Sequence, residues 1–266
     1  FRGNQLVDWN SNVLSQFPSI GNLQTPWRWR NAGTELLGNW LLACRQILGA
    51  GGAIDLRHVP QEVTWVRVAP GTAEQQRMEA ARTRAPTRDG SVLVIGDSRN
   101  ARGRQLMASR TPGATTVEPV EMKDLTEFGQ QFNVAAGDAL TRLVEFAGAV
   151  MTNVGAAELL RRVNSLRQGT ARNPPTPAEA AVVAFAVAPS LASACNALAQ
   201  ISNASNVRTY RPELLRSCMR SMQRAADGSC TFYAATLYER EKNRHMGRPL
   251  SRRSVGSTLL LKGLEA

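Results

Sequence analysis

Arginine supplies nearly all of the positive charge in this chain, and its side chain is well suited to phosphate chemistry. The 266 residues hold 32 lysines and arginines against 21 acidic residues, a formal net charge of +11. Lysine occurs only at positions 123, 242 and 262. The planar guanidinium group can bind phosphate oxygens through two parallel hydrogen bonds. The excess therefore favours a polyanionic partner, nucleic acid first, although abundant arginine and alanine also accompany a GC-rich genome.

The cysteines and histidines show no spacing that would bind a metal. No two cysteines form a C-x-x-C pair, and the histidines are isolated in the sequence. A zinc site is therefore not expected, and so few cysteines in so long a chain do not make a disulfide framework. We expect reduced thiols in a cytoplasmic protein. The residues are Cys44, Cys195, Cys218, Cys230, His58 and His245.

Helices and strands alternate in the first part of the chain. Apolar residues at helical spacing predict helices over 4–17, 31–48 and 72–83. The glycine cluster at 49–52 ends the second helix. It is not a phosphate-binding loop, because no strand precedes it and no Gly-Lys-Ser follows.

Three segments of this part have the character of strands. Leu23–Arg30 is expected to be a strand with its exit loop, and Val63–Val68 is rich in β-forming residues. Ser91–Ile95 is a continuous apolar run, which is typical of a buried parallel strand, and it leads through Gly96–Asn100 into a helix. The alternation predicts an α/β layer with a parallel sheet.

From about Val117 the sequence becomes helical, and a strand-like run returns only near the end. Amphipathic, alanine-rich helices are expected at roughly 121–130, 136–150, 155–167, 177–201, 211–226 and 230–243. A basic stretch follows between Arg244 and Arg253, which could meet duplex DNA or remain solvated, and then the apolar run Val255–Leu261. A sheet-forming lobe is thus predicted to be interrupted and resumed.

Four short segments follow one another along the chain: Phe1–Asn4, Leu23–Arg28, Val92–Arg102 and Thr258–Glu265. Their order and spacing resemble those of motifs in superfamily 1 DNA helicases of the UvrD/Rep family. Near the start, Phe1–Asn4 is similar to the end of motif III, and Leu23–Arg28 to motif IV. Val92–Arg102 and Thr258–Glu265 (TLLLKGLE) are similar to the family's IVa segment and to motif V. Val117–Phe128 resembles the beginning of the helical 2B insertion, which in the family lies between IVa and motif V.

The resemblance implies an α/β fold: a partial RecA-like, P-loop-type lobe with a parallel sheet, interrupted by a mostly α-helical inserted subdomain. Residues 1–116 would form the first part of lobe 2A, residues 117–252 the 2B-like insertion, and residues 253–266 the return to lobe 2A. The chain would then be a fragment that runs from motif III to motif V, with the N-terminal 1A/1B lobe of a longer protein as its intramolecular partner.

The resemblance also implies half of an ATP site. Arg28 matches the arginine finger that reaches ATP on the other lobe, where positive charge stabilises phosphoryl transfer. Trp27 matches an aromatic residue that stacks near the adenine, and Glu265 matches the motif V carboxylate that bonds the nucleotide sugar. The alternatives are a solvated or salt-bridged arginine, core packing of the tryptophan and an ordinary surface glutamate.

Five residues match DNA contacts of the family. Phe1 would stack on a base of single-stranded DNA, a contact that tolerates any sequence. Arg2 and Lys262 would touch the DNA backbone or the other lobe, and Arg99 and Thr258 are further candidates. Ordinary packing and solvated charge are the alternatives.

The chain departs from the family at Leu260, where motif V usually has a histidine, and at Pro26, where motif IV usually has an asparagine. The histidine contacts DNA and couples the two sites, so Leu260 puts part of motif V function in doubt. No G-x-x-x-x-G-K-[ST] motif and no acidic Walker B pair occur. ATP with Mg²⁺ would therefore be bound mainly by the missing first lobe, and this chain alone is expected to have no ATPase activity.

Three functions remain open from the sequence. The first is part of an ATP-dependent helicase that acts on single-stranded and duplex DNA in the bacterial cytoplasm, with no resident metal in this chain and no membrane association. The second is the same lobe within a helicase–nuclease or a defence protein. The third is a basic helical DNA-binding module without catalysis. Unwinding polarity, pathway and oligomeric state stay undetermined.

Overall fold

The computed structural model of this chain describes residues 8–17, 21, 25–245 and 250–261. By their internal contacts, residues 1–69 and residues 70–266 form two compact units, and each is described by itself. The sequence placed its boundaries instead at 116/117 and 252/253, within the second unit, and those boundaries remain predictions.

The regular secondary structure described in the first unit is helical, and residues 50–69 form neither helix nor strand. A π-helix, η1 (Trp9–Leu14), begins after Asp8, whose carboxylate accepts hydrogen bonds from the backbone N–H groups of residues 10 and 11. Helices α1 (Trp27–Asn31) and α2 (Glu35–Gly49) pack together where Gly38 meets Trp29, so closely that a Cβ on Gly38 would lie 2.7 Å from the tryptophan Cβ. The prediction of a helix that ends at the glycine cluster is confirmed, since α2 ends at Gly49.

Two strand predictions in this unit are wrong. Residues 27–31 form helix α1 and not the exit loop of a strand. Val63–Val68 forms no strand, and Trp65 and Val66 are each more than half exposed. A strand needs a neighbour to pair its N–H and C=O groups, and β-forming residues alone do not supply one.

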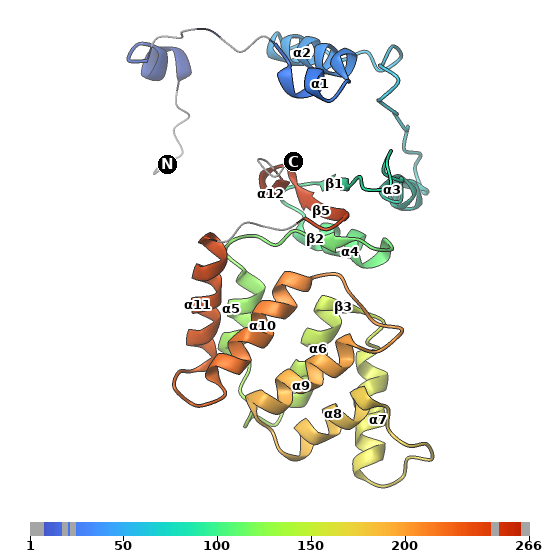
Figure 1. The fold of residues 1–266 in the computed structure, drawn as a ribbon, viewed down its shortest axis with the longest axis vertical. Coiled ribbons are helices and arrows are strands. Elements are labelled where there is room, and N and C mark those ends of the chain that lie inside the picture. Colours follow the sequence, from blue (N-terminus) through green and yellow to red (C-terminus); the bar gives the residue numbers. More distant parts are fainter. Residues whose placement is uncertain (1–7, 18–20, 22–24, 246–249, 262–266) are drawn as a thin grey trace. The chain divides into compact units, whose positions relative to one another are not determined.

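The second unit contains a three-stranded parallel sheet, so the α/β class with a parallel sheet is confirmed. The strands are β1 (Val92–Gly96), β2 (Thr115–Thr116) and β5 (Arg253–Ser257), in the order β1-β5-β2. Helices α3 (Ala73–Ala81), α4 (Ala101–Arg110) and α12 (Thr258–Leu261) accompany them. The last strand in sequence is thus the central one (Figure 1). We call residues 70–116 and 250–261 the sheet layer.

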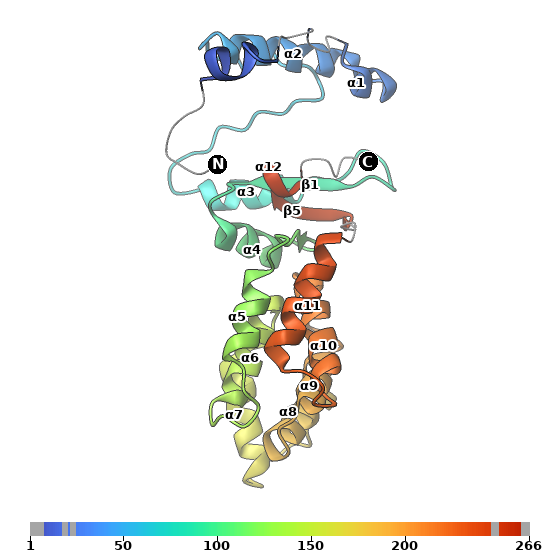
Figure 2. The ribbon, with the colours of Figure 1, turned by 90° about the vertical axis from the view of Figure 1, so that its left-hand side faces the viewer.

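Between β2 and β5 the chain forms a helical body, residues 117–245 (Figure 2). Its helices are α5 (Lys123–Gln131), α6 (Ala139–Val150), α7 (Ala156–Arg167), α8 (Pro177–Val187), α9 (Leu191–Ser202), α10 (Pro212–Ala225) and α11 (Phe232–His245). Two short strands, β3 (Met151–Thr152) and β4 (Arg208–Thr209), pair antiparallel within it. The helix predicted over 177–201 is divided into α8 and α9, because Pro189 has no backbone N–H to donate and Ser190 caps a new helix by accepting from the N–H of Ser193 at 3.0 Å.

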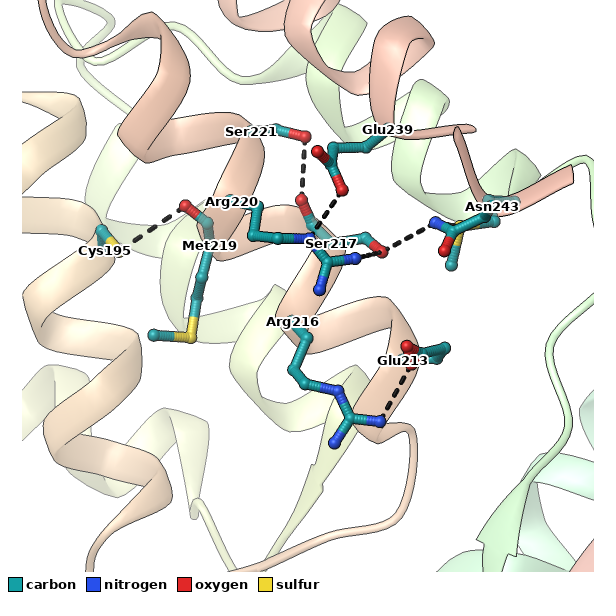
Figure 3. Close-up of polar contacts among 10 residues, drawn as sticks. Cys195, Glu213, Arg216, Ser217, Met219, Arg220, Ser221, Glu239 and Asn243 are labelled. Atoms are coloured by element: carbon teal, nitrogen blue, oxygen red, sulfur yellow. Dashed lines mark hydrogen bonds and ion pairs between the residues drawn. The ribbon is translucent and has the colours of Figure 1, made fainter. Parts of the chain in front are cut away.

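The helical body has its own apolar core, which is centred on phenylalanines. Phe128 stacks on Phe132 and Phe146 with ring centroids 4.9 and 4.2 Å apart. Polar contacts then join α10 to α11 (Figure 3). Arg220 Nε lies 2.6 Å from an oxygen of the buried Glu239, and Arg220 and Asn243 both donate to Ser217 Oγ at 3.0 Å.

Side chains near β4 tie the helical body to the sheet layer. The Arg208 guanidinium donates to the carbonyl oxygens of Ala108, Ser109 and Ala114 at 3.0, 2.8 and 2.6 Å. It thereby satisfies carbonyls at the end of α4, where a cation also opposes the helix dipole. Tyr210 packs with Val255 in a small second core, and its carbonyl accepts from the N–H of Thr116 at 2.8 Å.

Candidate nucleic-acid interface

The carboxyl ends of β1 and β5 bring two predicted DNA-binding residues to one edge of the sheet. Gly96, the last residue of β1, is in register with Ser257, the last of β5. Arg99 follows the first strand and Thr258 the second. Ser98 Oγ lies 3.4 Å from Thr258 Oγ1, although 160 positions separate them in sequence. In open α/β sheets, ligands bind outside this edge.

The turn that carries Arg99 is fixed by its own backbone contacts. The N–H of Arg99 donates to Asp97 Oδ1 at 2.9 Å, and Asn100 Oδ1 accepts from the N–H of Gly103 at 2.7 Å, which caps α4. The buried Arg104 donates a hydrogen bond to the carbonyl of Asp97. The Arg99 side chain is exposed and makes no ion pair within the described part of the chain. The backbone at Arg99 is therefore fixed, and its side chain is exposed to solvent.

Thr258 begins the short helix α12 and is also exposed. Ser257 beside it is buried, with 3% of its surface exposed, and its Oγ accepts from the N–H of Leu260 at 3.4 Å. Leu260, the next residue but one after Thr258 in α12, is partly buried. Together Ser98, Arg99 and Thr258 offer two hydroxyl groups and one guanidinium group, which are donors suited to phosphate oxygens.

Two of the three candidates for the ATP site, Trp27 and Arg28, lie on α1 in the first unit. Both Trp27 and Arg28 are exposed, and Trp27 exposes 59% of its surface. The Arg30 guanidinium lies over the Trp27 ring, 5.5 Å from its centroid, and 3.7 Å from the Glu35 carboxylate. Core packing, the alternative considered for Trp27, is therefore not what the structure shows.

Four predicted site residues lie outside the described part of the chain. They are Phe1, Arg2, Lys262 and Glu265.

Part of the predicted basic stretch has structural partners. Arg244 pairs with Glu241 at 3.2 Å, and Arg252 with Asp89 at 3.4 Å. Arg253 donates to the carbonyl of Ala81, the last residue of α3, and to that of Thr83 at 2.8 Å. The cations of this stretch are thus not all available to a partner.

Other arginines of the sheet layer were not singled out from the sequence. Arg77, Arg82, Arg84, Arg88 and Arg102 are exposed and make no ion pair among the described residues. Their clustering in the sequence was the available signal. The sheet layer holds ten arginines and four acidic residues, whereas the helical body holds fourteen basic and twelve acidic residues. The positive excess therefore lies chiefly in the sheet layer.

Within the described ranges, no three histidine, cysteine or acidic side chains gather where they could share a metal ion. The four cysteines are free thiols. None of the helices described is both long and apolar enough to cross a membrane.

No protein-family model, curated protein or solved structure was found to match this chain.

Proposed function

We propose that this chain is part of an ATP-dependent DNA helicase and contributes a partial RecA-like second motor lobe with an inserted helical subdomain. The observation that carries the proposal is the meeting of the Arg99 turn with Thr258 at the carboxyl edge of the sheet. Two segments that resemble separate helicase motifs, far apart in sequence, thus lie within hydrogen-bonding distance of each other. This edge would hold the backbone of single-stranded DNA in the cytoplasm.

The nucleotide would be ATP with Mg²⁺, held mainly by a first lobe that would carry the phosphate-binding motif that this chain lacks. Bound there, ATP supplies the energy of phosphoryl transfer. Of this chain's residues, Arg28 would stabilise charge on the transferred phosphoryl group and Trp27 would cover the base. These two residues have the chemistry that a nucleotide needs, a guanidinium group for the phosphate and an aromatic ring for the base. Both are exposed and adjacent in sequence on one short helix.

The charge distribution favours a motor lobe over a basic helical module. A non-catalytic helical module would need its cations on the helical body, but that body is nearly balanced in charge. The excess lies in the sheet layer, where the Arg99 turn is. A motor within a helicase–nuclease or a defence protein would use the same edge, and a nuclease domain elsewhere in the full-length protein would distinguish it.

Single-stranded DNA binding by this chain tests the carboxyl edge. Arg99→Gln should weaken binding of a 20-nucleotide strand about 3- to 10-fold and reduce the salt slope by about 0.7, because one phosphate contact is lost. Arg110→Gln, at the other end of α4 where Arg110 pairs with Glu74, is the matched control. Equal binding by the two variants, measured by fluorescence anisotropy, would contradict the proposal.

The role of Arg28 is tested in the full-length protein. Arg28→Ala should lower DNA-stimulated ATP hydrolysis about 10³-fold or more, the scale of arginine fingers, while DNA affinity stays nearly unchanged. Arg45→Ala, at an exposed position on α2, should retain activity. Full ATPase activity in the Arg28 variant would remove this residue from the site.

A further inference from the structure

A second group of arginines lies on the segment that joins α3 to β1. Residues 82–91, which we call the basic loop, have the sequence RTRAPTRDGS. Arg82, Arg84 and Arg88 are exposed, and none of them forms an ion pair with another described residue. The exposed Arg252 of the segment before β5 lies beside the loop, with its Nη2 3.4 Å from Asp89 Oδ1. Arg252 thus lies beside a loop that carries three further arginines and one carboxylate.

The basic loop is held in place at both ends and within itself. Arg253 donates to the carbonyls of Ala81 and Thr83, which fixes its start. The N–H of Val92 donates to the carbonyl of Arg252 at 2.8 Å, which fixes its end. Gly90 folds back onto the loop, where an added Cβ would lie 3.0 Å from Ala85 Cβ. The backbone that carries the arginines is therefore ordered before a partner binds, which lowers the entropy cost of binding.

The basic loop and the Arg99 turn lie at opposite ends of the sheet. The loop leads into Val92, which is paired with Arg253 at the amino ends of β1 and β5, whereas Arg99 follows the carboxyl ends. Four strand steps separate these ends along β1, a distance of about 13 Å. The two groups of cations are thus separate surfaces.

We propose that the basic loop binds the phosphate backbone of duplex DNA. Arg82 and Arg84 are two positions apart, so their Cα atoms lie at most about 7 Å apart, a span that lets the two forks reach neighbouring phosphates. The loop contains no aromatic residue on which an unpaired base could stack. The loop therefore recognises the negative charge of the phosphates and not the bases. The density of this charge is greatest on a duplex, which has one phosphate per about 1.7 Å of helix axis.

This inference does not rest on the proposed function. The basic loop can bind a duplex whether or not the carboxyl edge binds a single strand, and its binding requires no ATP.

The test compares two triple variants that change the net charge equally. R82Q/R84Q/R88Q removes the cations of the basic loop, and R161Q/R167Q/R172Q removes three exposed arginines on and after α7. Binding to a 20-base-pair DNA duplex and to one of its strands is measured by fluorescence anisotropy over a range of KCl concentrations. The loop variant should bind duplex at least 10-fold more weakly, with a salt slope lower by about 3. The α7 variant should change less than 3-fold.

A lysine variant separates charge from folding. R82K/R84K/R88K keeps the three charges, so it should bind duplex within about 3-fold of the unchanged chain and retain its salt slope. Circular dichroism melting checks that each variant is folded. If the glutamine loop variant does not fold, two other measurements test the inference. The lysine variant should still bind duplex DNA, and a monoclonal antibody against residues 82–91 should block duplex binding by the unchanged chain.

Three results of the DNA-binding measurements would overturn the inference. They are equal losses in both glutamine variants, an equal loss for single strand and duplex in the loop variant, or absence of duplex binding by the unchanged chain. Binding to vesicles of phosphatidylserine and phosphatidylcholine is also measured. If the loop variant lost binding to vesicles and kept binding to duplex DNA, the partner of the basic loop would be a lipid surface instead. If Arg99→Gln has no effect on single-strand binding while the loop variant loses duplex binding, only the proposed function fails.

Discussion

Arg211 and Glu118 form a buried, bidentate ion pair within the helical body, between the start of α10 and the segment that follows β2. Arg211 Nε lies 2.7 Å from Glu118 Oε1, and Arg211 Nη2 lies 2.7 Å from Glu118 Oε2. Their side chains expose only 4% and 6% of their surface. Burial alone would lower the pKa of Arg211, but hydrogen bonds and charges from Glu118 and Asp124 outweigh it and raise the pKa above its usual value. The guanidinium therefore stays charged inside the helical body.

Removing one partner of this pair should destabilise the second unit. Arg211→Met leaves Glu118 buried without its cation, which should lower the free energy of unfolding by about 3–5 kcal/mol. The double variant R211M/E118M leaves no buried charge and should regain most of that loss. Urea unfolding followed by circular dichroism measures both. A single variant as stable as the unchanged chain would show that the pair contributes little.

A matched pair of glycines tests the packing of α5 against α11. A Cβ on Gly129 would lie 2.6 Å from Thr236 Cγ2, and Thr236 is fully buried. Gly129→Ala should therefore cost about 1–3 kcal/mol through overpacking. Gly148 on α6 has no neighbour within 4 Å of an added Cβ, so Gly148→Ala should stabilise the helix by up to about 1 kcal/mol. Thermal melting of the two variants should shift in opposite directions.

Alkaline pH should weaken the helical body. Burial raises the pKa of the Cys195, Cys218 and Tyr210 side chains. A raised pKa means that the unfolded chain releases these protons at lower pH than the folded chain does. The stability is therefore fully present below about pH 8.5, the usual cysteine pKa, and decreases as pH rises through the folded values.

Urea unfolding at pH 7.5 and pH 10 measures this effect. Cys218→Ala should reduce the difference in unfolding free energy between the two pH values. Val182→Ala removes a fully buried side chain of the same core that does not titrate. It should lower stability at both pH values without changing their difference. Unfolding free energies that are equal at pH 7.5 and pH 10 would show that these groups do not contribute.

Much of the secondary structure could be predicted because its signals are local. The continuous apolar run at 91–95 lies largely within β1, the helical pattern at 72–83 appears as α3, and the helix expected after Asn100 is α4. The helix stop at Gly49 was also predictable, because a glycine cluster acts within one turn of the chain. The division of α8 from α9 was missed, although Pro189 and Ser190 carried a local signal for it.

The candidate site was predictable only in part. The sequence marked Arg99 and Thr258 through their resemblance to separate motifs, and the structure brings their segments together. The sequence did not identify the arginines of the basic loop as candidates, because a run of charged residues looks the same in a sequence whether its arginines are paired or not. Arg104, Arg208 and Arg253 illustrate the point, since each donates to backbone carbonyls and has a structural task.

The sequence by itself determined the positive charge and most of the helices, since the signals for a helix lie within a few positions of one another. Only the tertiary structure decided that β5 lies between β1 and β2, that Val63–Val68 forms no strand, and which arginines remain exposed. The physical reason is common to all three. A strand needs another strand to pair its N–H and C=O groups, and a buried guanidinium group needs hydrogen-bond acceptors. The fold brings these partners from distant parts of the chain.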